Sequence, residues 1–130
     1  MDISIIIPLL NEEASLNELH QWISKVMKSN AYSYELIFID DGSKDQSWSI
    51  ITKLASENTE VNGVRFLENF GKSQALHAGF AKAKGDVIIT MDADLQDSPE
   101  EILDAHTRTR MFFAQTLNPL CLGHWRVERL

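Results

Sequence analysis

The sequence predicts an α/β domain built on a parallel sheet with helices on both faces. Short apolar runs rich in isoleucine and valine alternate with segments in which apolar residues recur at helical spacing. Such an alternation implies parallel strands joined by right-handed crossovers. Polar and mostly acidic residues follow the ends of the apolar runs. Because the carboxyl ends of parallel strands share one edge of the sheet, we expect these side chains to gather there, where such sheets bind ligands.

The first strand is expected over residues 3–9, where three consecutive isoleucines precede Pro8 and the polar Asn11. A run this apolar is typical of a parallel strand that is buried on both faces. The helix after it is expected to end near residues 29–30 and to pack an apolar stripe onto the sheet. That stripe consists of Leu16, Leu19, Ile23 and Val26. His20 lies beside the stripe, and we expect it at the surface.

The second strand is expected over residues 34–39 and leads into Asp40 and Asp41. Ser43 and Gln46 have the spacing of a capping box, which predicts the start of the second helix. A weaker third strand is expected over residues 61–67.

The third helix is expected over residues 73–84. Ala75, Ala78 and Gly79 give it a slim face that can lie close to a sheet or a ligand. Gly85 is expected to end this helix, since glycine is common just beyond a helix terminus.

The fourth strand, expected over residues 87–91, leads directly into Asp92, Asp94 and Asp97. Carboxylates this close repel one another by about 1–4 kcal/mol per close pair, and a divalent cation removes that cost. Mg²⁺ or Mn²⁺ suits such oxygen ligands better than Zn²⁺ does. Residues 98–101 have the pattern of another helix start, so the carboxylates are expected in a strand-to-helix loop.

Composition narrows the classes of function. With 130 residues, 44% of them hydrophobic, the chain suits one ordinary globular domain. The net charge of −7 and the lack of a basic stripe argue against nucleic acid as a partner. The single cysteine, Cys121, excludes an internal disulfide, and no apolar stretch approaches the length of a membrane helix. We therefore expect a cytoplasmic protein.

Three phosphate-handling alternatives share this architecture and fit less well. A dinucleotide-binding domain needs a glycine-rich first turn, but residues 8–13 contain no glycine. Gly71-Lys72-Ser73 suggests a P-loop, yet Phe66 stands where its first glycine is required. A phosphorylated-aspartate protein also wants a hydroxyl residue and a lysine at later strand ends, which this chain does not supply. The remaining hypothesis is a nucleoside diphosphate held through a metal, with an acid of the second strand near the base or ribose.

Four segments, in this order and spacing, resemble family 2 glycosyltransferases. They are Ile-Pro-Leu-Leu-Asn-Glu-Glu at 7–13, Phe-Ile-Asp-Asp-Gly-Ser at 38–43, Asn-Phe-Gly-Lys at 69–72 and Met-Asp-Ala-Asp-Leu-Gln at 91–96. The resemblance covers residues 3–103 and is strongest to the branch of dolichol-phosphate mannosyltransferase and bacterial polyprenyl-phosphate sugar transferases. It implies the amino-terminal, nucleotide-binding half of a GT-A (Rossmann-like) fold.

The resemblance also implies a nucleotide-diphosphate sugar, Mg²⁺ or Mn²⁺, and a set of binding residues. The residues that would contact the nucleotide sugar are Pro8, Leu10, Glu12, Asp40, Asp41, Lys72 and Asp92. Of these, Pro8, Leu10 and Glu12 would border the nucleoside. Asp40 would contact the base or ribose with support from Asp41, and Lys72 would lie near the donor. Asp92, Asp94 and Gln96 would hold the metal.

An inverting transfer follows from this assignment, because a single displacement at the anomeric carbon leaves a nucleoside diphosphate whose charge the metal stabilises. The acceptor implied is a polyprenyl or dolichyl phosphate, and the full-length family would work at the cytoplasmic face of the membrane. The alternative is an inactive nucleotide-binding remnant that serves as a structural or interaction domain.

Residues 104–130 depart from the family pattern. They hold four of the five arginines and no lysine, whereas residues 1–103 hold all seven lysines. We therefore predict a domain over residues 1–103 and an atypical tail over 104–130, in a truncated chain. The 130 residues alone are expected to show no detectable sugar transfer. Uncovered strand edges and apolar surface would also favour a homo-oligomer.

Overall fold

The computed structural model describes residues 1–96, 98–100 and 127–129. Its elements alternate as the sequence predicts: β1 (Ile3–Leu9), α1 (Leu16–Ser29), β2 (Tyr34–Asp40), α2 (Ser47–Glu57), β3 (Val61–Phe66), α3 (Lys72–Lys82), β4 (Val87–Thr90) and β5 (Val127–Arg129). Asp97, the helix expected after it and most of the 104–130 tail lie outside the described residues.

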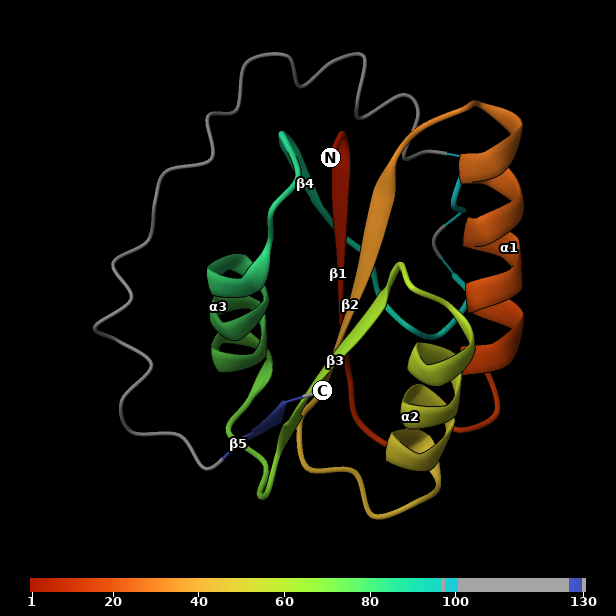
Figure 1. Ribbon diagram of the computed structural model, residues 1–130. Helices are drawn as coiled ribbons and strands as arrows, with labels where there is room; N and C mark the ends of the chain where they lie inside the picture. Colours follow the sequence, from red (N-terminus) through yellow and green to blue (C-terminus); the bar gives the residue numbers. More distant parts are fainter. Residues whose placement is uncertain (97, 101–126, 130) are drawn as a thin grey trace.

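The strands form one sheet in the order β4-β1-β2-β3-β5. β1 pairs in parallel with β2 and β4, and β2 pairs in parallel with β3. Helices α1 and α2 cover one face and α3 covers the other (Figure 1). The predicted parallel sheet with helices on both faces is therefore confirmed. The antiparallel pairing of β5 with β3 was not predicted, because the tail has no alternating pattern.

The core lies on both faces of the central strands. Along β2, Leu36 and Phe38 pack toward α1 and α2, while Ile37 and Ile39 pack toward α3. All four are fully buried, which explains why the strand carries no polar alternation. The slim face of α3 lets that helix approach closely, since a Cβ on Gly79 would stand 2.4 Å from Ile6 Cγ2.

A buried polar cluster fixes the start of β4 at the amino edge of the sheet. Ser4 Oγ donates to the buried carboxylate of Glu35, which also accepts the Lys84 N–H at 2.7 Å. The Gly85 N–H donates to Ser4 Oγ at 2.7 Å. A Cβ on Gly85 would stand 2.5 Å from the Ser4 nitrogen, so this position requires glycine for close approach. The expectation that Gly85 caps α3 is wrong, because the helix ends at Lys82.

The expected capping box of Ser43 and Gln46 is also wrong. Helix α2 begins at Ser47 with Gln46 as its cap residue, and the Gln46 side chain makes no capping hydrogen bond. Instead, Ser43 Oγ accepts the Asn11 N–H of the neighbouring β1–α1 loop at 2.8 Å. The Ser43 hydroxyl thus bonds across the sheet edge rather than to the start of its own helix.

His20 is buried, contrary to the expectation of a surface position, and is only 7% exposed. Its Nε2 atom lies 3.9 Å from Glu60 Oε1 and has no hydrogen-bond partner. Burial lowers the pKa of His20, with the Glu60 carboxylate opposing that shift.

A pH dependence of stability follows from this buried histidine. The unfolded chain takes up a proton near the ordinary pKa of about 6.5, whereas folded His20 resists protonation. Its contribution is therefore fully present above about pH 6.5 and is lost as the pH falls toward the lower folded pKa. Urea titrations between pH 8 and pH 5.5 should show a smaller loss of unfolding free energy for His20→Gln than for the parent. Equal losses in the two proteins would contradict this assignment.

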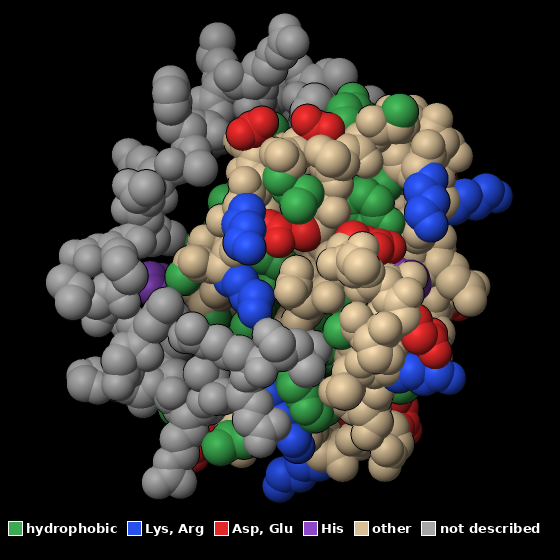
Figure 2. All heavy atoms as spheres, viewed as in Figure 1, with side chains coloured by type: hydrophobic (Ala, Val, Ile, Leu, Met, Phe, Trp, Pro, Cys, Tyr) green, Lys and Arg blue, Asp and Glu red, His purple; other side chains and the backbone are tan. Residues whose placement is uncertain are grey.

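The surface of the described residues is of mixed charge. On the face seen in Figure 2, acidic, lysine and arginine side chains are interspersed without a continuous basic patch among the described residues. No helix in the described part of the chain is long and apolar enough to cross a membrane. β4 has one described neighbour in the sheet, β1, and Leu67 is 52% exposed. Association into a homo-oligomer stays a prediction.

Candidate functional site

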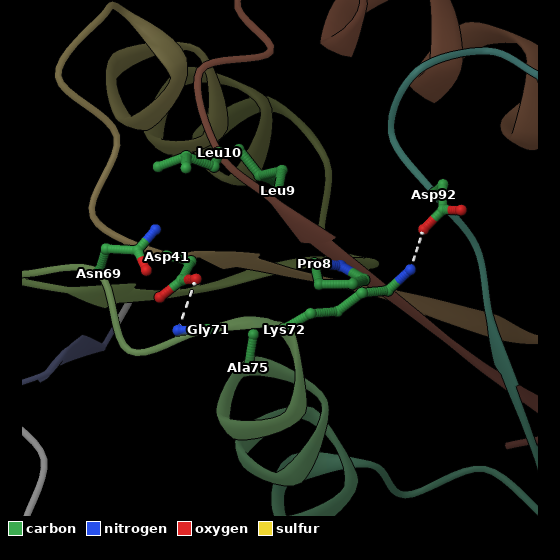
Figure 3. Close-up of a pocket in the computed structure, with 9 residues that line it drawn as sticks. All are labelled: Pro8, Leu9, Leu10, Asp41, Asn69, Gly71, Lys72, Ala75 and Asp92. Carbon is green, nitrogen blue, oxygen red and sulfur yellow. Dashed lines mark hydrogen bonds and ion pairs between the residues drawn. The ribbon is translucent and has the colours of Figure 1, made fainter.

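A pocket of about 310 Å³ opens at the carboxyl edge of the sheet. The ends of β1, β2 and β4 and the start of α3 meet there, as the close-up in Figure 3 shows. Its lining residues are Pro8, Leu9, Leu10, Asp41, Asn69, Gly71, Lys72, Ala75 and Asp92. The pocket is thus apolar on the β1 side and charged where Lys72 meets Asp92.

The structure brings together part of the predicted site. Five predicted residues line the pocket: Pro8, Leu10, Asp41, Lys72 and Asp92. Four predicted residues are not among its lining: Glu12, Asp40, Asp94 and Gln96. The lining also includes Leu9, Asn69 and Gly71, which lie in the family-like segments 7–13 and 69–72, and Ala75, which was signalled only by the slim face of its helix.

Asp41 links two loops through its carboxylate. The side chain is buried, with Oδ1 accepting the Phe70 N–H at 2.8 Å and Oδ2 accepting the Gly71 N–H at 3.0 Å. Beside it, Gly42 has φ +82, and a Cβ there would stand 2.6 Å from the Glu68 carbonyl carbon. The two loops are therefore packed backbone against backbone, and Asp41 fixes the turn from which α3 begins.

Lys72 and Asp92 form an ion pair at the mouth of the pocket. Lys72 is the first residue of α3, and Asp92 lies just beyond β4. The Lys72 Nζ atom is 2.6 Å from Asp92 Oδ1, and the two side chains are 62% and 51% exposed. The pair joins the two sides of the pocket (Figure 3), and both side chains remain more than half exposed.

Asp40 is the last residue of β2 and does not line the pocket, whereas Asp41, the next residue, does. It is fully buried, and its Oδ1 atom accepts the Ser43 N–H at 2.8 Å. Its Oδ2 atom is buried without a hydrogen-bond partner. In this structure Asp40 supports the β2–α2 loop, and its contact with the base or ribose stays a prediction.

Hydrogen bonds also join the β1–α1 loop to the β2–α2 loop. Asn11, which has φ 53, accepts the Lys44 N–H at 2.9 Å through Oδ1 and donates its own N–H to Ser43. The Glu12 N–H donates to Ser47 Oγ at 3.0 Å, and Glu13 Oε2 accepts the Gln46 N–H at 2.9 Å. This network holds Leu10, which is 43% exposed, at the rim of the pocket.

The loop after β4 presents two exposed carboxylates on either side of the buried Ala93. The carbonyl of Ala93 accepts the hydroxyl of Ser15 at 2.6 Å, which ties the loop to the start of α1. Asp94 Oδ1 accepts the Gln96 N–H at 3.2 Å, and Leu95 between them has φ 64. The loop is therefore held at the Ala93 carbonyl and at the turn that includes Leu95, while the side chains of Asp92 and Asp94 remain exposed.

The two carboxylates of this loop suit Mg²⁺ or Mn²⁺ if a bound nucleotide supplies the other ligand oxygens. Among the described residues, no group of three or more His, Cys, Asp or Glu side chains is placed to hold a metal ion. Mg²⁺ in nucleotide sites is typically held by one or two carboxylates, and the phosphates of the ligand complete its shell. Asp92 and Asp94 fit that arrangement, in which the nucleotide supplies the remaining oxygens.

An α/β sheet with its pocket at the carboxyl edge defines the class of ligand-binding doubly wound domains. Within that class the family is shown: residues 4–109 match the model of glycosyl transferase family 2, and the chain belongs to this family. It is 48% identical over 101 residues to an undecaprenyl-phosphate 4-deoxy-4-formamido-L-arabinose transferase from Shewanella sediminis. A protein of the same name from Pseudomonas fluorescens is 46% identical over 101 residues.

Solved structures confirm the predicted GT-A type of fold. The chain is similar to glucosyl-3-phosphoglycerate synthase from Mycobacterium tuberculosis in complex with UDP, with a TM-score of 0.60 and 28% identity over 78% of this chain and 37% of that one. It is also similar to a mannosyltransferase from Pyrobaculum calidifontis, solved with GDP-Man and Mn²⁺, with a TM-score of 0.67 and 24% identity. That match covers 79% of this chain and 30% of the other.

The chain spans 30% of the length of these transferases from Pseudomonas and Shewanella, and the match covers 77% of the chain itself. The family match ends at residue 109, six residues beyond the predicted boundary at 103. The assignment of residues 104–130 as an atypical tail stays a prediction.

Proposed function

We propose that the described domain binds the nucleotide-sugar donor of a family 2 glycosyltransferase. The observation that carries this proposal is the pocket itself, which brings an apolar wall and the Lys72–Asp92 pair together at the carboxyl edge of the sheet. Dinucleotide and P-loop sites would need glycine-rich turns that this chain lacks at the corresponding positions.

The charges of the pocket suggest how the donor lies. Lys72 is the one cationic side chain among the described lining residues, so the diphosphate is placed near it and near the Asp92–Asp94 loop. The nucleoside is placed along Pro8 and Leu10, with Asn69 available for polar contacts. Glu12 and Asp40 support this part of the pocket through the two joined loops rather than from its lining.

The metal is placed between the loop and the diphosphate. Asp92 and Asp94 would supply carboxylate oxygens, and Gln96 would supply its amide oxygen, to Mg²⁺ or Mn²⁺. When bound, the metal stabilises the negative charge that develops on the departing nucleoside diphosphate. The protein's own part is to hold these oxygens on a loop whose backbone is fixed by Ser15 and by the turn at Leu95.

The acceptor proposed for the whole protein is a polyprenyl phosphate. Relatives with 46–48% identity carry undecaprenyl phosphate in their names. A phosphate acceptor is ionised at neutral pH, so its oxygen can attack the anomeric carbon without a strong general base. A single displacement of this kind inverts the anomeric centre. Because such lipids reside in membranes, the proposal also has the whole protein act at a membrane face.

A thermal-shift panel of nucleoside diphosphates with and without Mn²⁺ tests the binding step. UDP comes first, because a similar solved structure with 28% identity contains it. A ligand at 100 times its Kd stabilises the folded state by about 2.7 kcal/mol, which gives a clear shift for a domain of this size. We expect a shift that requires both nucleotide and metal. The absence of a metal-dependent shift with every nucleotide would overturn the proposal.

A further inference from the structure

We infer that Lys72 is a placeholder cation: it neutralises Asp92 while the site lacks metal, and it turns to the donor's phosphates once a divalent cation takes its place. This inference rests on the proposed donor site and adds to it a role for one lysine in two states. Its first basis is geometry, since the Lys72 ammonium lies 2.6 Å from a carboxylate that belongs to the loop assigned to metal binding.

The surroundings of the pair explain why Lys72 can serve both partners. The turn just before α3 is fixed by Asp41, which accepts the backbone N–H groups of Phe70 and Gly71. The backbone of Lys72 is thereby held at the pocket, while its side chain remains 62% exposed. Because a lysine side chain is long and flexible, its ammonium can move from a carboxylate to a nearby phosphate while the backbone stays in place.

The Lys72–Asp92 ion pair is weak enough for a divalent cation to replace the ammonium. Exposed ion pairs contribute little to stability, because water and salt screen them. Replacing the ammonium at Asp92 with a divalent cation therefore costs little, and the divalent cation would neutralise Asp94 as well as Asp92. The displaced ammonium then faces a diphosphate, where charge-assisted hydrogen bonds are about twice as strong as neutral ones.

The experiment compares Lys72→Met with Lys53→Met, an exposed lysine on α2 that serves as the control for the same change in net charge. Mn²⁺ binding is followed by electron paramagnetic resonance of the free ion, first without nucleotide. Lys72→Met should bind Mn²⁺ about 2- to 5-fold more tightly than Lys53→Met, because the competing ammonium is gone. With Mn²⁺ saturating, calorimetry should show UDP binding to Lys72→Met about tenfold more weakly than to Lys53→Met.

The inference requires that Lys72→Met shows both the tighter Mn²⁺ binding and the weaker UDP binding. Equal Mn²⁺ affinities of the two variants would overturn the placeholder role, and so would tighter Mn²⁺ binding with unchanged UDP affinity. Asp94→Asn separates this inference from the proposed site. If Asp94→Asn loses metal-dependent UDP binding while the lysine variants behave alike, only the placeholder role fails. If Asp94→Asn binds as the parent does, the proposed metal site fails as well.

Discussion

Replacing Asp41 with alanine is expected to lower the free energy of unfolding by about 2–5 kcal/mol, one of the largest single effects in the domain. The substitution removes the acceptor of two backbone N–H groups, those of Phe70 and Gly71, which are partly buried. Each hydrogen bond to a charged group is worth about 1.5–3 kcal/mol, and the loss leaves unpaired donors behind. Urea denaturation followed by circular dichroism measures the change.

Two variants serve as controls for this prediction. Asp41→Asn keeps the volume and one carbonyl acceptor, so we expect a smaller loss of stability than for Asp41→Ala. Asp86→Ala removes an exposed carboxylate just before β4 and should change stability by less than about 0.5 kcal/mol. If Asp41→Ala is no less stable than Asp86→Ala, the carboxylate does not hold the two loops together.

The elements of the fold could be predicted because their signals are local. Buried isoleucines mark β1, and the stripe that includes Leu19 and Ile23 marks α1; both are buried as predicted. The errors arose where groups far apart in the chain satisfy each other. Ser43 has the spacing of a helix cap, yet its hydroxyl bonds to Asn11 in another loop. Hydrogen bonds across loops leave no periodic trace in a sequence.

Asp40 and Asp41 show which part of the site could not be predicted from the sequence. The sequence places both carboxylates at the end of β2 but cannot decide which one faces the pocket. A strand buried on both faces lacks polar alternation, so its pattern does not reveal the direction of any side chain. The structure resolves the choice, because Asp41 lines the pocket while Asp40 is buried beside Ser43.

Removing the carboxylate of Asp94 is expected to reduce metal-dependent nucleotide affinity by at least about tenfold, since even residues that only orient metal ligands cost 10- to 100-fold when lost. The fold should tolerate the change, because Asp94 is exposed and its loop is held by backbone contacts such as Ala93 to Ser15. Without metal, we expect unchanged or slightly higher thermal stability, since repulsion with Asp92 is relieved.

Two substitutions distinguish loss of charge from loss of loop structure. Asp94→Asn keeps an oxygen that can accept the Gln96 N–H, whereas Asp94→Ala removes it. If the charge holds the metal, both variants lose the Mn²⁺-dependent part of UDP affinity in calorimetry while their melting temperatures without ligand stay near that of the parent. If only Asp94→Ala loses affinity, the turn at Leu95 matters rather than the charge. Parent-like affinity for UDP and Mn²⁺ in both variants would remove Asp94 from the metal site, because a carboxylate ligand cannot be neutralised without weakening the cation it holds.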